Sequence, residues 1–219
     1  TNLVENNGAT GSSNGVYIAS FGAILASNLT VNLSGAGGAK LVNAYQYLLA
    51  PKPITLTGVN TYSGGTMISA GILDVVHSGT GQGIPAGIVT ITNTGMLRLQ
   101  KDNQISLSAT VLVAGGTYEL LQHNDNAGML VLDNGGQILN GGNVSKTLTV
   151  STNLDFRSGL CATVLAGAAV LTKSTSATVM LTMNNGYTGG TLISSGILQL
   201  GDGTSTNRGT LGRSEERRV

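Results

Sequence analysis

Short runs of alternating apolar and polar residues recur along the chain, and each run follows a small residue. In the first clear run, Leu73 and Val75 alternate with Asp74. Because alternate residues of a strand point to opposite faces, this pattern predicts short strands with one buried face. The small residues stand at positions 71, 95, 116, 136, 159, 177 and 196, at intervals of 24, 21, 20, 23, 18 and 19 residues. The best helix candidate is the segment 39–49.

A longer repeat contains this short one. Residues 56–75 and 181–200 are identical at 12 of 20 positions, without a gap, at an offset of 125 residues. Six of the short intervals make up that offset. A sandwich or barrel would show turn signals every 8–12 residues, whereas one returning repeat length is typical of a solenoid. The sequence therefore predicts an all-β parallel solenoid with coils of about 21 residues, stacked about 4.8 Å apart.

Composition narrows the classes of protein that remain. Charged residues make up only 10% of the chain and 33 residues are Gly, which disfavours helical bundles and coiled coils. The net charge of +1 leaves no electrostatic signature for nucleic acid. The single cysteine, Cys161, excludes an internal disulfide framework and a multi-cysteine metal site. No apolar stretch approaches the roughly 20 residues of a membrane-spanning helix.

Both long copies carry the pattern Y-x-G-G-T-x-I-x-x-G-x-L, which resembles the autotransporter-associated β-strand repeat, also called the passenger-associated transport repeat. The first copy matches at Leu56, Thr57, Gly58, Asn60, Thr61, Tyr62, Gly64, Gly65, Thr66, Ile68, Gly71 and Leu73. The second matches at Leu181, Thr182, Asn185, Tyr187, Gly189, Gly190, Thr191, Ile193, Gly196 and Leu198, and departs at Met183 and Gly186. Segments 33–40 and 165–173 resemble an element that often precedes the repeat. The resemblance implies a right-handed parallel β-helix.

Three regions follow from this pattern. Residues 1–50 are expected to form degenerate N-terminal coils, and residues 51–212 a β-helix that carries both repeats. Residues 213–219 break the composition of the rest and resemble the translation of a common sequencing adapter, with a natural charged linker as the alternative. Because no basic segment precedes the apolar stretch 16–26 and the chain begins at Thr1 without Met, a signal peptide is not supported, and the chain is expected to be an internal piece of a longer protein.

The acidic residues offer one candidate for catalysis. Asp74 and Glu119 follow their small residues by the same three places, and Arg98 takes that place in the run between them. On one outer face the two carboxylates would lie about 10 Å apart, a spacing that suits an inverting glycosidase pair. An acid–Arg–acid row is explained more simply as a charge-balanced surface. We therefore predict no catalytic residue.

Other chemistry-bearing residues have structural interpretations. His77 and His123 are interpreted as solvated histidines, and residues 123–126 as a polar turn rather than a cation loop. Cys161 is interpreted as a small core residue. The Gly pairs 64–65 and 189–190 lack the Lys-Ser/Thr of a phosphate loop and are interpreted as coil corners. No cofactor-binding or metal-binding residue, and no cofactor, is predicted.

The resemblance also implies a function and a location. It implies a structural segment of a secreted, surface-displayed passenger of a Gram-negative-type bacterium, exported by type V secretion, and not an enzyme. We expect an extracellular stalk with a role in adhesion or aggregation. Expected partners are an outer-membrane translocator barrel in the parent protein and surface glycans or neighbouring cells. A polysaccharide-active β-helix enzyme, either a lyase or a glycoside hydrolase, is the alternative, and a specific adhesin surface is a third hypothesis.

Overall fold

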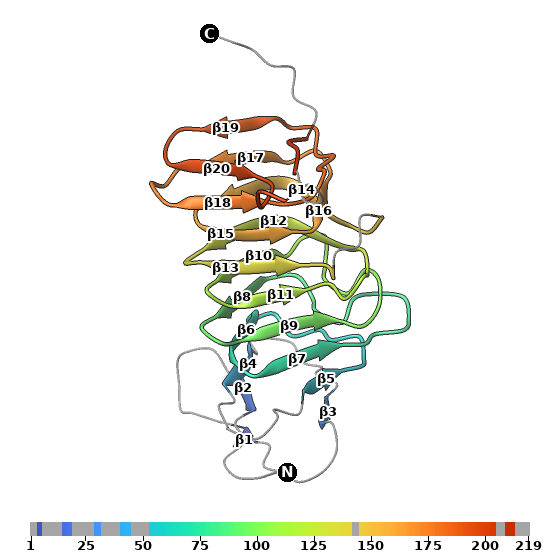
Figure 1. Cartoon of the computed structure of the whole chain (residues 1–219). Coiled ribbons are helices and arrows are strands. Elements are labelled where there is room, and N and C mark those ends of the chain that lie inside the picture. The colour runs from blue at the N-terminus through green and yellow to red at the C-terminus, as the bar shows by residue number, and fades with distance from the viewer. Residues whose placement is uncertain are drawn as a thin grey trace.

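The structure, a computed structural model, describes residues 53–141, 145–204 and 209–212, together with the strands at 4–5, 15–18, 29–31 and 40–44. The described chain is all β and winds into a parallel solenoid of about seven turns. Strands at the front run one way and strands at the back return, so that the coil climbs from the N-terminus to the C-terminus in a right-handed sense (Figure 1). The predicted solenoid is confirmed.

Two sheets form the walls of the solenoid. The large sheet has 11 strands in the order β1-β2-β4-β6-β8-β10-β12-β14-β17-β19, with β16 beside β14. All of its neighbours pair in parallel except β1 and β2, which are antiparallel. The bounds are β1 Val4–Glu5, β2 Gly15–Ile18, β4 Lys40–Ala44, β6 Thr66–Ala70, β8 Ile88–Thr92, β10 Thr110–Ala114, β12 Asp125–Asp133, β14 Thr147–Phe156, β16 Val164–Ala166, β17 Val170–Lys173 and β19 Thr191–Ile193.

The small sheet faces the large one and has nine strands in the order β20-β18-β15-β13-β11-β9-β7-β5-β3. All of its pairings are parallel. The bounds are β3 Leu29–Val31, β5 Ile54–Leu56, β7 Ile72–Val75, β9 Met96–Leu99, β11 Thr117–Glu119, β13 Gly136–Leu139, β15 Gly159–Ala162, β18 Thr178–Leu181 and β20 Ile197–Leu200.

The register of the small sheet gives the length of each coil. One column of Cα partners passes through Leu73, Leu97, Tyr118, Ile138, Cys161, Leu181 and Leu200, so that coils are 19 to 24 residues long. The predicted coil length is confirmed, but one predicted alignment is wrong, because Gly159 pairs with Val179 and not with Ala177. A slip of two residues leaves every side chain on the same face, so hydrophobic alternation cannot distinguish the two registers.

The predicted helix at 39–49 is also wrong where the structure describes it. Residues 40–44 form β4, which pairs in parallel with β2 on one edge and β6 on the other. Pairing on both edges satisfies the backbone N–H and C=O groups, and this tertiary context overrides a weak local helix preference. Residues 45–49 lie outside the described residues.

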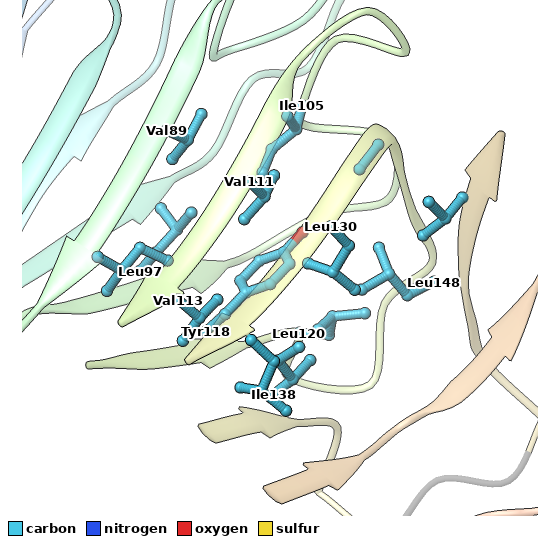
Figure 2. Packing of buried hydrophobic residues seen from close by; sticks show 14 of the residues in the cluster. Val89, Leu97, Ile105, Val111, Val113, Tyr118, Leu120, Leu130, Ile138 and Leu148 are labelled. Carbon is cyan, nitrogen blue, oxygen red and sulfur yellow. The ribbon is translucent and has the colours of Figure 1, made fainter. Parts of the chain in front are cut away.

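The core is one apolar column between the two sheets. Figure 2 shows Tyr118, Leu97 and Ile138 of the small sheet facing Val111 and Leu130 of the large sheet, and all five are 0% exposed. Each such side chain contributes about 1.5–3 kcal/mol on burial, whereas ordering the backbone costs about 1–2 kcal/mol per residue. A single coil cannot offset that cost alone, so the fold depends on stacking between coils.

The small-residue rhythm has a steric cause. A Cβ on Gly95 would lie 2.2 Å from the carbonyl oxygen of Ile68 in the preceding coil, and one on Gly136 would lie 2.5 Å from that of Val113. Such approaches are far closer than van der Waals contact, so only a residue without a side chain fits at these positions. Most glycines of the rhythm therefore mark places where the backbones of successive coils approach too closely for a side chain, whereas Ala177 carries one.

Candidate functional site

The residues of the long repeat build the same corner twice. In the first copy the buried Tyr62 hydroxyl lies 2.7 Å from the Thr66 hydroxyl, across the Gly pair between them. In the second copy Tyr187 and Thr191 make the same contact at 2.7 Å. Burial raises the pKa of Tyr62 to about 12, against the hydrogen bond to Thr66, which favours the ionised form. The two tyrosines are therefore un-ionised side chains that fill the interior of a corner.

The Gly pairs make the turn itself, as predicted. Gly65 has φ of +84° and Gly190 has φ of +87°, a region that favours glycine. A Cβ on Gly65 would also lie 2.6 Å from the carbonyl oxygen of Ile88 in the next coil. The turn therefore needs glycine both for its backbone conformation and for the approach of the next coil.

An asparagine in each repeat joins its coil to the next. The Asn60 amide donates to the carbonyls of Gly58, at 3.0 Å, and Gly83, at 2.6 Å. The equivalent Asn185 donates to Met183, at 2.9 Å, and Thr210, at 2.7 Å. The departure from the repeat pattern at Met183 is harmless to this bridge, because the acceptor is a backbone carbonyl.

Removing the asparagine bridge is expected to lower the free energy of unfolding, and the loss should be larger where the bridging hydrogen bond is buried. Asn60→Ala should lower the free energy of unfolding by about 1–2 kcal/mol, because the bond to Gly83 is buried. Asn185→Ala is the matched variant: its bond to Thr210 is exposed, so this bridge should contribute less, although the variant also removes the acceptor of the Leu165 backbone N–H. Urea denaturation followed by circular dichroism would measure both, and equal costs would contradict the assignment.

The predicted row of Asp74, Arg98 and Glu119 exists on the outer face of the small sheet. Arg98 is the Cα partner of Asp74 on one side and of Glu119 on the other. Its guanidinium donates to both oxygens of Asp74, at 2.7 and 2.8 Å, and these bonds raise the pKa of Arg98. Asp74 is 7% exposed. With both of its oxygens engaged, Asp74 serves as the counter-ion of Arg98, which favours the charge-balanced interpretation of the row.

Arg98→Met should test this pairing. Removal of the guanidinium leaves the buried Asp74 carboxylate without its partner, and we expect the free energy of unfolding to fall by about 1–3 kcal/mol. Glu119→Gln keeps the Arg98–Asp74 pair and should change stability by less than about 0.5 kcal/mol. The denaturation midpoint of each variant, at constant m-value, would measure the two changes in stability. A larger loss of stability for Glu119→Gln than for Arg98→Met would contradict the pairing of Arg98 with Asp74.

A second polar cluster lies where three successive coils turn. Asp102 accepts from the His123 ring at 2.9 Å and from the Asn124 backbone N–H at 3.1 Å, and its carboxylate lies 3.5 Å from the Lys146 ammonium. Partial burial would raise the pKa of Asp102, but these hydrogen bonds outweigh it and lower the pKa. Within the described residues, no group of three His, Cys, Asp or Glu side chains is placed to hold a metal ion. The cluster joins coils through a shared carboxylate.

Two interpretations from the sequence are wrong. Asp125 is not part of the polar turn predicted at 123–126: it begins β12, is 0% exposed, and accepts from the Tyr118 hydroxyl at 2.5 Å and the Ile105 N–H at 3.1 Å. His77 is not solvated either, being 8% exposed, with its backbone N–H bound to the side chain of Gln104. Both residues face inward at corners, where strand alternation gives no guidance.

Two further chemistry-bearing groups, Cys161 and Lys173, are buried in the interior. Cys161 is 1% exposed, as predicted, and burial raises the pKa of its thiol to about 12. Lys173, which sequence reasoning missed as a functional group, is 0% exposed and donates from Nζ to the carbonyls of Thr175 and Ser195. Its ammonium therefore ties the turn after β17 to the turn after β19.

Comparisons with known proteins identify the repeat. The family model of the passenger-associated transport repeat matches residues 54–75 and 171–200. No curated protein and no solved structure matched the chain. The part of the chain that the structure describes contains no helix long and apolar enough to cross a bilayer. The two matched regions coincide with the two corners built from Asn, Tyr, Gly-Gly and Thr.

Proposed function

Because the chain carries two passenger-associated transport repeats on a parallel β-solenoid, we propose that it is a stalk segment of an autotransporter-type passenger displayed outside a Gram-negative-type bacterium. The observation that carries the proposal is the coincidence of both repeats with solenoid corners. Ten strands along the large sheet, about 4.8 Å apart, make a rod about 40–45 Å long. Such a segment extends the reach of whatever the parent protein carries at its tip.

The mechanical role is supported by how the coils are joined. Side chains join one coil to the next at several corners, as with Asn60 to Gly83, Asp102 to His123 and Lys173 to Ser195. Together with continuous backbone ladders, these bonds make bending or fraying of one coil costly for its neighbours. Adhesion or aggregation would then arise from the outer faces, where surface glycans or neighbouring cells are the proposed partners.

The test is display on a cell. Residues 1–212 are fused between a signal peptide and an outer-membrane translocator barrel in a Gram-negative host, next to a translocator without insert. We expect the segment to be reached by antibody on intact cells, to resist protease as a folded rod, and to increase cell clumping. Retention inside the cell would overturn the passenger assignment, and display without clumping would overturn the adhesive role alone.

The enzyme alternative is tested with the same displayed segment. A panel of polysaccharides is incubated with the cells, and reducing or unsaturated sugar ends are measured. We expect no release above the translocator control, because Arg98 engages both oxygens of Asp74. Sugar release that Asp74→Asn abolishes would overturn the structural assignment.

A further inference from the structure

Asn-Gly pairs occur at three places in the described part of the chain, at 134–135, 140–141 and 185–186. An asparagine before glycine can lose its side-chain amide without an enzyme, because glycine leaves its backbone nitrogen sterically open. After base removes the proton from that nitrogen, the nitrogen attacks Cγ of the asparagine and closes a succinimide ring. The Cγ–Nδ2 bond breaks, and Nδ2 takes up a proton and leaves as ammonia. Water then opens the ring to aspartate or isoaspartate.

Two of the three pairs are held by hydrogen bonds. Asn140 is 0% exposed and accepts from the Gln122 N–H at 2.7 Å. Asn185 donates to two carbonyls in the bridge described above and accepts from the Leu165 N–H at 2.9 Å. The attacking nitrogen is engaged in this pair as well, because the Gly186 N–H donates to the Leu165 carbonyl at 2.8 Å. Ring closure at either pair therefore requires these hydrogen bonds to break first.

The pair at 134–135 has none of these restraints. Asn134 and Gly135 are the two exposed residues of the turn between β12 and β13. Among the described residues, the Asn134 side-chain amide makes no hydrogen bond, and only its backbone N–H is bonded to a side chain, that of Asp133. The Gly135 N–H donates to the rotatable Ser158 hydroxyl at 3.1 Å. A Cβ on Gly135 would meet nothing within 4 Å, so the turn has room to adopt the geometry of attack.

We propose that Asn134 is a site of spontaneous deamidation, at which the folded chain exchanges an amide for a carboxylate. The new charge arises beside Asp133, which already shares the Arg157 guanidinium with Asp155, at 3.3 and 2.7 Å. The formal net charge of +1 falls to zero, which reduces the repulsion between copies of the chain. The modification therefore changes the electrostatics of one corner of the large sheet with time.

The chain contains its own comparison at the same corner. Asn93 begins the equivalent turn two coils earlier, because the last residues of β8 and of β12 both pair with Ala114. Asn93 has φ of +53° and Asn134 has φ of +50°, and both are exposed. Asn93 is followed by Thr94, whose branched side chain shields the attacking nitrogen. Asn93 should therefore keep its amide where Asn134 loses it.

Peptide mapping of the complete 219-residue chain tests the site. The folded chain is incubated in mildly alkaline buffer, and tandem mass spectrometry after digestion reports aspartate and isoaspartate at each asparagine separately. Asn134 should be converted at least about tenfold faster than Asn140 or Asn185, because local opening must precede reaction at those two. In concentrated urea the three should react at similar rates, because no fold protects them. Equal rates in the folded chain, or an unmodified Asn134, would overturn the proposal.

Two variants test the cause. Thr94→Gly should make Asn93 a second site of conversion, because it opens the attacking nitrogen in an equivalent exposed turn. Asn134→Gln should abolish conversion at that position, because glutamine would have to close a less favourable six-membered ring. Far-ultraviolet circular dichroism of both variants checks that the solenoid is kept. An Asn93 that stays intact in folded Thr94→Gly would overturn the assignment of reactivity to this corner.

Discussion

Gly159→Ala is expected to lower the free energy of unfolding by about 3–5 kcal/mol. Gly159 has φ of +129°, a conformation that an alanine adopts only with strain. A Cβ there would also lie 2.3 Å from the carbonyl oxygen of Gly136, its own Cα partner in β13. Neither backbone can move away without breaking the hydrogen bonds between β13 and β15. The cost of backbone strain and the cost of the steric clash therefore add at this position.

Gly135→Ala is the matched control. Gly135 also has a positive φ, of +73°, but an added Cβ would meet nothing within 4 Å. Its cost should therefore be limited to backbone strain, about 1–2 kcal/mol. Thermal and urea unfolding of both variants, followed by far-ultraviolet circular dichroism, would measure the difference. Similar losses at the two positions would show that close approach between coils does not limit stability here.

The solenoid could be predicted from the sequence because its determinants are local and repeated. Alternation in runs such as 71–75 reports which face is buried, and the returning glycines report where coils approach. The corner chemistry of the long repeat was visible as a motif, although its hydrogen bonds were not. The two-residue register error at Val179 shows the limit of this reasoning, because alternation is unchanged by an even slip.

The polar interior could not be predicted in the same way. Asp125, His77 and Lys173 all lie in or beside corners, where no period tells an inward side chain from an outward one. Each is paired with a group 20 to 27 residues away or across a turn, as with Asp125 to Ile105 and His77 to Gln104. Which residue lies beside a corner residue depends on the length of the coil between them, and coil lengths vary from 19 to 24 residues. A coil that is one residue longer or shorter would place a different residue there.

Asp125 makes stability depend on pH. Burial is the main cause that raises the pKa of Asp125 from 3.8 to about 6, against hydrogen bonds from Tyr118 and backbone N–H groups. Because the folded pKa is above the unfolded one, the native state holds a proton that the unfolded state has already released. Stability should therefore fall as the pH rises from about 4 to about 6 and level off above that. Asp125→Asn should remove this dependence.

Tyr118→Phe is expected to lower the free energy of unfolding by about 2–3 kcal/mol at pH 8, because it removes a hydroxyl donor 2.5 Å from a buried carboxylate. At pH 5 the carboxyl group is largely protonated, so the loss should be clearly smaller. Tyr62→Phe is the control, since Tyr62 bonds the neutral Thr66 and its loss should be the same at both pH values. Urea denaturation of both variants at pH 5 and pH 8 measures the two costs. If Tyr118→Phe cost the same at both pH values, the Asp125 carboxyl group would not change its ionisation between pH 5 and pH 8.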